Sequence, residues 1–150
     1  MVLTIAAGTS DRGSGSAELD HPHGVFVDDK YDLYVADCGN NRVQLFESGE
    51  SVATTIVGGR LASVTNSLNC PTSITFDAQK YLFIIDSNNH RIVRFGTNGF
   101  HCVIGCRGGD PLLTQLSFPS SLSFDRSGNL FVTDTGNSRI QKFQYLQHSC

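Results

Sequence analysis

The sequence predicts an all-β fold built from repeated four-stranded units, and three observations lead to this prediction. A segment of 26 residues occurs three times, at residues 21–46, 70–95 and 118–143. The copies are offset by 49 and 48 residues and align without insertion. Within each copy, apolar residues either alternate or form a short continuous run, and no segment shows helical periodicity. A fixed period of this length indicates a modular architecture.

The second residue of each copy is a proline, and a strand pattern follows it. A proline can occupy the first position of a strand because its missing N–H is not needed there. The residues after it alternate between apolar and mixed positions, which predicts a strand with one face more deeply buried than the other. The apolar positions are Val25 and Val27, Ile74 and Phe76, and Leu122 and Phe124.

The second strand of each copy is a continuous apolar run, LYVA, LFII or LFVT. Such a run predicts a strand in the middle of a sheet that is covered on both faces. The pattern Asp-x-Gly/Asn-Asn-x-Arg then predicts a turn, because the carboxylate can accept turn N–H groups and Gly or Asn tolerates positive φ. The third strand carries apolar pairs, namely Val43 and Phe46, Ile92 and Phe95, and Ile140 and Phe143.

A fourth strand is predicted at 51–59 and 100–109, and its remaining copy is the opening VLTIAAG at 2–8. Four short antiparallel strands in roughly 48 residues are typical of a β-propeller blade. We therefore expect a single domain, 1–150, with blades at about 22–59, 71–109 and 119–150. The strand at 2–8 is expected to complete a neighbouring blade. WD40 and kelch blades are not indicated, because the chain has no tryptophan.

Three blades would leave two sheet edges open, which an isolated domain tolerates badly. The predicted strand order begins with a fourth strand and stops before one. Two arrangements would satisfy the edges: the chain is a segment of a longer propeller, or two copies close head to tail into a six-bladed ring. We expect the second, a homodimer in which the first strand of one chain completes the last blade of the other.

Composition narrows the classes of function. The chain is 39% hydrophobic and 17% charged, with a net charge of −3. No stretch approaches the roughly 20 apolar residues of a membrane span. A surplus of Lys and Arg, which backbone-driven nucleic-acid binding requires, is lacking. The five cysteines are an odd number, which in a secreted protein leaves one thiol free or paired between chains. The compartment stays open, with a slight preference for secretion.

The pattern Pro-x-[GS]-[VIL]-x-[VF]-Asp, an apolar strand, and Asp-x-[GN]-Asn-x-Arg-[VI] resembles the NHL repeat in all three copies. The resemblance implies a propeller that usually has six blades, so three blades would be half of one. Some similar propellers are lyases that cleave α-hydroxyglycine peptides with zinc held by histidines of several blades. Others end tripartite-motif ubiquitin ligases and select a protein or RNA partner.

The acidic, amide and basic residues of the turns are expected to be structural. Chemistry needs one site, whereas every blade needs the same brace, so we assign no catalytic residue. The predicted brace residues are Asp37, Asn40, Arg42, Asp86, Asn89, Arg91, Asp134, Asn137 and Arg139.

A binding site is better sought where the copies differ. The residues around each proline should lie at the start of the innermost strand, near the mouth of a central channel. They would form a polar rim for a small ligand or a peptide end, and they are His21, His23, Thr72, Ser73, Ser120 and Ser121. His90 replaces Asn41 and Ser138 in its turn, and we expect it to be exposed.

The resulting prediction is a non-catalytic scaffold that binds a protein or peptide, without cofactor or metal. The alternative is a lyase-like or other ligand-processing enzyme. Its catalytic zinc would need three protein ligands, but only the first repeat places His near the channel, where Thr72 and Ser120 stand in the others. The spacing of Cys102 and Cys106 is also wrong for a zinc knuckle. RNA binding ranks third, with Arg91, Arg94 and Arg107 as the nearest basic group.

Overall fold

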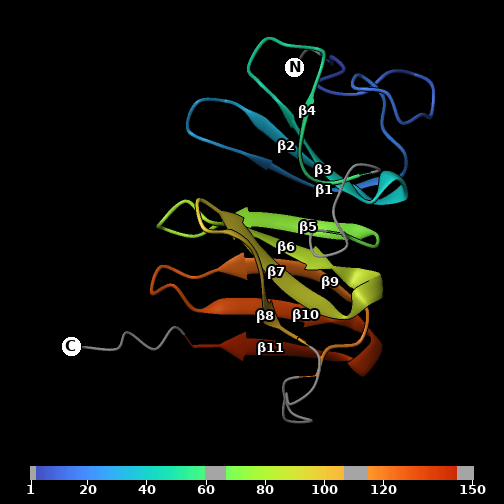
Figure 1. Cartoon of the computed structure of the whole chain (residues 1–150). Coiled ribbons are helices and arrows are strands. Elements are labelled where there is room, and N and C mark those ends of the chain that lie inside the picture. Colours follow the sequence, from blue (N-terminus) through green and yellow to red (C-terminus); the bar gives the residue numbers. More distant parts are fainter. Residues whose placement is uncertain (1–2, 60–66, 107–114, 145–150) are drawn as a thin grey trace.

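The structure, a computed structural model, describes residues 3–59, 67–106 and 115–144 (Figure 1). It consists of separate antiparallel sheets, one for each copy of the repeat. The first blade has the order β1(Pro22–Val27), β2(Leu33–Asp37), β3(Arg42–Phe46), β4(Thr54–Gly58). The second has β5(Pro71–Phe76), β6(Leu82–Asp86), β7(Arg91–Gly96), β8(Gly99–Ile104). The third has β9(Pro119–Phe124), β10(Leu130–Asp134), β11(Arg139–Phe143).

The predicted turns after the second strands are short 3-10 helices, η1(Cys38–Asn40), η3(Ser87–Asn89) and η4(Thr135–Asn137). No helix long and apolar enough to cross a membrane occurs among the described residues. The fourth strands β4 and β8 lie in the regions predicted for them, although 107–109 fall outside the described residues. The end of the third predicted blade, 145–150, is also outside them.

The second strand of the middle blade, β6, is covered on both faces, as its continuous apolar run predicts, whereas Phe131 and Thr133 of β10 are only half-buried. In β6, Ile84 and Ile85 point to opposite faces and are both fully buried. Ile84 belongs to the core between the first two blades, together with Ala36 and Val43. Ile85 belongs to the core between the second and third blades, with Leu122 and others. The blades therefore stack face to face (Figure 1), and the apolar side chains between them form the core.

The innermost strands of neighbouring blades approach each other closely. A Cβ atom on Gly24 of β1 would lie 2.6 Å from the backbone oxygen of Thr72 and 2.9 Å from Cα of Ser73, both in β5. Only glycine leaves room for this approach. The starts of the inner strands are thereby brought side by side, where the sequence predicts a rim.

The N-terminus differs from the prediction, because residues 3–8 form no strand. Val2 lies outside the described residues. A strand is defined by a hydrogen-bonded neighbour, and this segment has none in the described chain. Instead, Ala7 packs on the outer face of the first blade, against a cluster that includes Val35 and Phe46. Leu3 and Ile5 remain 94% and 73% exposed.

Two disulfides are present within the residues that the structure describes, and the sequence left both pairings open. Cys38 of η1 is joined to Cys70, which directly precedes β5, so this bond links the first two blades. Cys102 is joined to Cys106 at the end of the second blade. Cys150 lies outside the described residues. The linked residues are 32 apart in the first case and 4 apart in the second.

The two disulfides should differ in how much they stabilise the fold. In the chain-entropy model, the longer loop restricts the unfolded chain more, by about 2 kcal/mol for these two separations. We expect Cys38→Ser/Cys70→Ser to lower the free energy of unfolding more than Cys102→Ser/Cys106→Ser by about that amount. Chemical denaturation of the two variants measures the difference, and equal losses would contradict the prediction.

Candidate functional site

A buried carboxylate lies at the end of the second strand in every blade. Asp37, Asp86 and Asp134 are all 0% exposed. One oxygen of each accepts a hydrogen bond from a backbone N–H 17 residues earlier, at 2.7, 2.6 and 2.7 Å respectively. The donors are Asp20, Asn69 and Ser117, in the segments that lead into the blades. Each carboxylate thus fixes the point at which the chain enters its blade.

The second carboxylate oxygen accepts hydrogen bonds from the side chains predicted as brace partners. The donors are Arg Nε, at 2.7 Å in every blade, and the amide of the Asn three residues after the Asp, namely Asn40, Asn89 or Asn137. The guanidinium groups also reach the entry segments. Arg91 donates to the carbonyl of Ser67 and Arg139 to that of Gln115.

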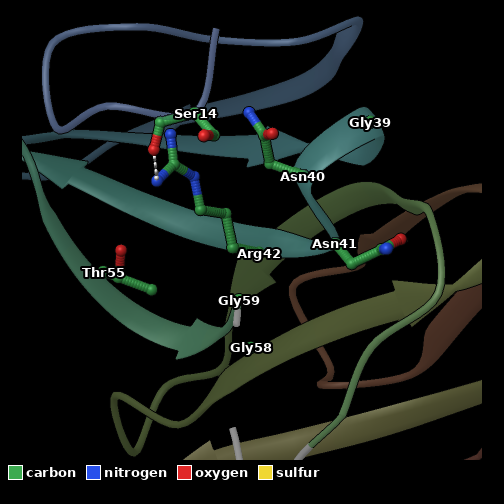
Figure 2. A pocket seen from close by; sticks show the side chains of 8 residues that line it. All are labelled: Ser14, Gly39, Asn40, Asn41, Arg42, Thr55, Gly58 and Gly59. Atoms are coloured by element: carbon green, nitrogen blue, oxygen red, sulfur yellow. Dashed lines mark hydrogen bonds between the residues drawn. The ribbon is translucent and has the colours of Figure 1, made fainter. Parts of the chain in front are cut away.

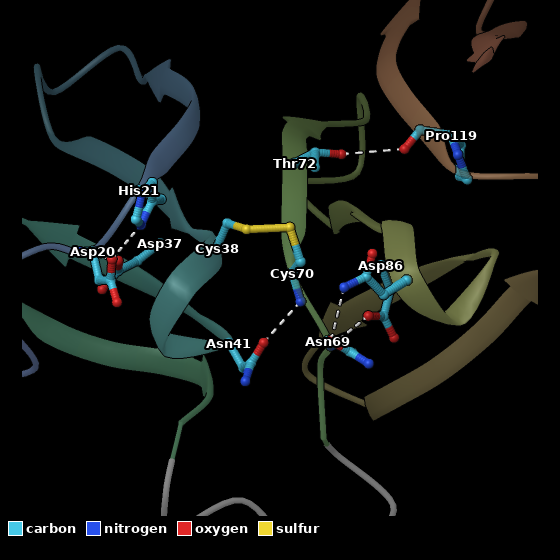
Figure 3. Close-up of a disulfide and its surroundings, with 11 residues drawn as sticks. Asp20, His21, Asp37, Cys38, Asn41, Asn69, Cys70, Thr72, Asp86 and Pro119 are labelled. Carbon is cyan, nitrogen blue, oxygen red and sulfur yellow. Dashed lines mark hydrogen bonds and ion pairs between the residues drawn. A yellow bond between two sulfur atoms is a disulfide. The ribbon is translucent and has the colours of Figure 1, made fainter. Parts of the chain in front are cut away.

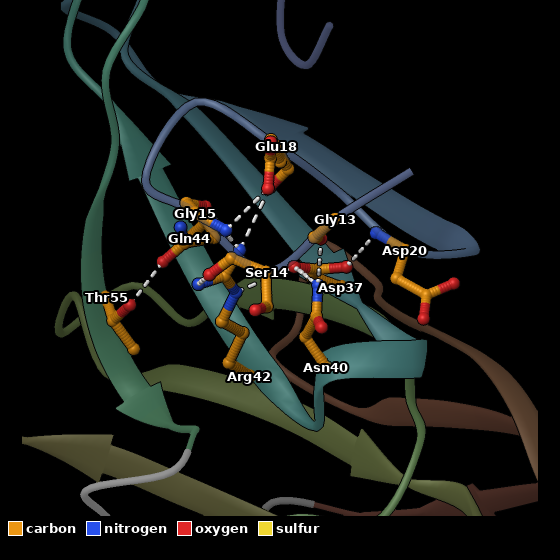
Figure 4. A network of polar contacts seen from close by, with 10 residues as sticks. All are labelled: Gly13, Ser14, Gly15, Glu18, Asp20, Asp37, Asn40, Arg42, Gln44 and Thr55. Atoms are coloured by element: carbon orange, nitrogen blue, oxygen red, sulfur yellow. Dashed lines mark hydrogen bonds and ion pairs between the residues drawn. The ribbon is translucent and has the colours of Figure 1, made fainter. Parts of the chain in front are cut away.

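The brace of the first blade also reaches the segment that leads into β1 (Figure 4). Arg42 donates to Asp37 and also to the carbonyl oxygens of Ser14, Gly15 and Glu18, at 2.9 to 3.0 Å. A pocket of about 360 Å³ lies beside it, lined by Thr55 among others (Figure 2). Because these backbone contacts occupy the guanidinium, the pocket does not present it to an anion.

The brace in the third blade shifts the pKa of its carboxyl. Burial by itself raises the pKa of Asp134. Hydrogen bonds from Asn137, the Ser117 N–H, Arg139 and Gln141 outweigh burial and lower the pKa to about 2. The ionised form is therefore the form that the fold stabilises.

Neighbouring blades are joined by a polar link at the same position in each pair. The residue after the 3-10 turn has left-handed backbone and accepts a hydrogen bond from the next blade. Asn41 Oδ1 accepts from the Cys70 N–H at 2.8 Å, and His90 Nδ1 accepts from the Phe118 N–H at 3.0 Å. The expectation that His90 is exposed is wrong, because this bond and the edge-on Phe118 ring, 4.4 Å between centroids, leave it half-buried.

The residues before the three prolines share an uncommon backbone conformation. His21, Cys70 and Phe118 have φ values of 46°, 52° and 45°. Few non-glycine residues adopt this region, and a following proline disfavours helical conformations further. The brace holds the residue before each of them, and the link between blades holds Cys70 and Phe118 themselves. The three inner strands consequently start with the same geometry.

The predicted rim residues lie at these strand starts, but several already have structural partners. Thr72 Oγ1 donates to the Pro119 carbonyl at 3.3 Å, across two inner strands (Figure 3). Ser73 Oγ accepts from the Leu122 N–H at 3.4 Å. Ser120 Oγ lies 2.7 Å from Thr135 Oγ1.

His21 pairs with Asp20, whose carboxylate also contacts Arg12. Burial raises the pKa of Asp20, but the hydrogen bonds from His21 and Arg12 outweigh it and lower that pKa overall. His23 and Ser121 are exposed. Four of the six predicted residues are exposed and therefore open to a ligand, namely His21, His23, Ser120 and Ser121.

The structure also brings together three metal-ligating side chains that the sequence analysis did not connect. The ligand atoms of His23, Cys38 and Cys70 all lie within 4.8 Å of one another. His23 is exposed and the two cysteines are half-buried. No spacing motif marks this group, because Cys38 and Cys70 come from different blades. The available signal was that both cysteines flank the predicted rim.

At the opposite ends of the strands, pockets lie between the blades. One of about 460 Å³ has Phe26, Tyr34 and Phe76 in its wall. Another, of about 340 Å³, lies between the second and third blades and includes Arg94, whose guanidinium stacks 4.5 Å from the Tyr81 ring centroid. Both are open to solvent beside charged hairpin turns.

The repeated brace, the inner prolines and the blade topology agree with a known family model. The NHL repeat model matches residues 19–46 and 116–143, the first and third copies. The chain contains NHL repeats. The second copy has the same strand order and the same brace, although the family model does not match it. No curated protein matches the whole sequence significantly.

Solved structures show the same fold at low identity. An auxiliary nutrient binding protein from Bacteroides thetaiotaomicron has a TM-score of 0.66 and 14% identity over 81% of this chain and 36% of its own. Virginiamycin B lyase from Staphylococcus aureus has a TM-score of 0.55 and 14% identity, over 83% of this chain and 41% of its own. A gluconolactonase from Xanthomonas campestris has a TM-score of 0.56 and 19% identity, over 75% of this chain and 34% of its own. The NHL chain is a set of β-propeller blades that spans less than half the length of each of these structures.

The lowered pKa of Asp134 predicts a contribution to acid stability. Because the pKa is lowered in the fold, the stabilisation is full above the unfolded value near 3.8 and is lost as the pH falls through about 2. Its size is on the order of 2 kcal/mol. In Asp134→Asn, the free energy of unfolding should therefore fall less between pH 4 and pH 2 than in the unmodified protein. Equal slopes in denaturation at several pH values would contradict this assignment.

Proposed function

We propose that this NHL protein is a non-catalytic β-propeller scaffold that binds a protein or peptide partner through its loops and the mouth of its channel. The observation that carries the proposal is the use made of the Asp–Arg pairs. These are the buried polar groups best suited to acid–base chemistry, yet each one braces its own blade. The exposed polar groups at the rim, His23, Ser120 and Ser121, are therefore more suitable for recognition than for catalysis.

A rigid rim favours binding of an extended or terminal peptide segment. The inner strands start with matched backbone geometry, and the links between blades hold them in place. Hydroxyl and imidazole groups can donate to and accept from peptide groups. Because the rim is pre-organised, the protein itself would lose little conformational entropy when a peptide binds.

We further propose that a second copy of the chain completes the ring. Val25 and Val27 of β1 are 64% and 54% exposed, whereas Ile74 and Phe76 occupy the corresponding positions of the second blade and pack against the first. At the other end of the arc, Ile140 is 64% exposed. Its counterpart Ile92 is fully buried between blades.

The two end blades carry the equivalents of the linking residues, an acceptor position on the third blade and a donor position on the first. Ser138 occupies the position of Asn41 and His90, with the same left-handed backbone. His21 occupies the position of Cys70 and Phe118. In a head-to-tail pair, Ser138 of one copy would accept from the His21 N–H of the other.

One backbone feature of the fourth strands, a glycine with positive φ at the end, recurs in the N-terminal segment. Gly58 ends β4 beside Arg42 with a φ of 78°, and Gly105 follows β8 beside Arg91 with a φ of 72°. Gly8 has a φ of 83°. Within the described residues, the outer edge of β11 has no neighbouring strand. The register of β3 with β4, including its shift after Val43, would place Gly8 opposite Arg139.

The same register places Ala7 opposite Ile140 and Ile5 opposite Gln141. The equivalent shift after Ile92 in the second blade supports this alignment. The exchanged strand would pair with the outer edge of β11 and cover the exposed apolar side chains nearby.

Ring completion predicts a dimer of about twice 16.3 kDa. Ile140→Lys would place a charge in the joint and should raise the dimer dissociation constant at least roughly tenfold. The control Val103→Lys, at a 39% exposed position of β8 in the middle blade, lies away from the joint and should leave the dimer intact. Sedimentation at several concentrations tests this, and a monomeric unmodified chain would overturn ring completion.

Peptide binding at the rim is tested with peptides selected from a displayed random library. We expect Ser120→Arg to weaken binding of the selected peptides by about tenfold or more, because the long side chain fills the rim. The matched control, Ser51→Arg in an exposed hairpin of the first blade, should not weaken it. Peptides that bind both variants equally would contradict a binding site at the rim.

The second candidate function is ligand processing, and the grouping of His23 with Cys38 and Cys70 favours it. Three ligands and an open position are the requirement of a catalytic zinc. Turnover of an α-hydroxyglycine peptide that depends on bound zinc would overturn the non-catalytic proposal. Zinc binding without turnover would leave that proposal intact.

A further inference from the structure

We propose that His23, Cys38 and Cys70 form a binding site for one zinc-class divalent cation when the Cys38–Cys70 disulfide is reduced. The site would lie at the inner rim, between the first and second blades (Figure 3). It is independent of ring completion, because all three ligands come from one chain.

The distances suit a single ion. Zinc binds thiolate sulfur at about 2.3 Å and imidazole nitrogen at about 2.0–2.1 Å, which places neighbouring ligand atoms roughly 3.5–3.8 Å apart in a tetrahedron. The three ligand atoms already lie within 4.8 Å of one another. Rotation of the side chains after the sulfur–sulfur bond opens is therefore sufficient to bring them around an ion.

The backbone around the ligands is held by contacts that do not depend on the disulfide. Cys70 donates its N–H to Asn41. Cys38 directly follows Asp37, whose carboxylate is fixed by the brace of the first blade. His23 lies in β1, whose next residue, Gly24, packs tightly on β5. The ligand positions would therefore persist after reduction.

The site is accessible to both reactants. His23 is exposed, and the cysteines are half-buried at the rim rather than in a core cluster. A thiolate of a small dithiol reductant can attack one sulfur and release the other as a thiolate. The second thiol of the reductant then attacks the mixed disulfide and releases the other protein sulfur as a thiolate. The protein disulfide gains two electrons and two protons, and the reductant becomes a cyclic disulfide.

Binding of the cation then releases the two thiol protons to solvent. The imidazole of His23 contributes a lone pair in its neutral form. Two thiolates balance the double charge of the ion, so no uncompensated charge is placed at the half-buried position. The fourth coordination position is left for water. A cross-link between the two blades would thus exist in the oxidised form as a disulfide and in the reduced form as a metal bridge.

The test uses the full chain, reduced with a dithiol and freed of reductant without air. Cobalt(II) serves as a coloured probe, and zinc is titrated against a chromophoric chelator. We expect one cobalt per reduced chain with thiolate-to-cobalt absorption, displacement by zinc, and no such absorption in the oxidised protein. His23→Ala should lower zinc affinity at least roughly tenfold, as loss of a ligand outweighs the 10–100-fold effect of outer contacts.

The controls separate this site from the other thiols. His101→Ala removes an exposed histidine next to Cys102, and Cys102→Ser/Cys106→Ser removes the other pair; both should keep the affinity, as should Cys150→Ser. Unchanged affinity in His23→Ala, or loss of binding in the Cys102→Ser/Cys106→Ser control, would overturn the proposal. So would a reduced chain that unfolds, by circular dichroism, and is not restored by zinc.

Discussion

Every blade depends on one buried carboxylate that receives hydrogen bonds from three parts of the chain. In the second blade, Asp86 binds the N–H of Asn69, the amide of Asn89 and the guanidinium of Arg91. Removal of the Arg would leave a buried charge without its partner, which costs about 3–5 kcal/mol. The brace fixes the entry to the inner strand and the turn beyond the second strand together. The left-handed residue before the proline, and hence the rim, follows from that constraint.

Much of this arrangement is predictable because the pattern is local. Alternation after the prolines, the continuous run of the second strand and the Asp-to-Arg spacing predict the blade topology. Contacts between blades are less accessible, because their partners are separated by whole repeats. Nothing in the spacing of Cys38 and Cys70 indicates that they meet, and the bond from Phe118 to His90 depends on how two blades stack. Residues 3–8 of the strand predicted at 2–8 form no strand, because a strand requires a neighbour and the described part of the chain places none beside them.

The rim combines structural and recognition roles. Thr72 and Ser73 join the second and third inner strands through hydrogen bonds. The six rim residues are therefore not equally available to a ligand. His23 stands apart because it is exposed beside a cross-link between blades. The scaffold and metal-site proposals therefore concern the same surface. One relies on its rigidity, and the other on the chemistry of two cysteines that contribute to that rigidity.

The central claim is that the contacts that join neighbouring blades within one chain also join the third blade of one chain to the first blade of a second chain. Amide hydrogen exchange of residues 3–8 and of β11, measured at low and high protein concentration, tests it most directly. The account predicts that both segments become protected together as the concentration rises, because each supplies the hydrogen-bond partner of the other. Exchange at the rate of free peptide in residues 3–8 at every concentration would contradict it.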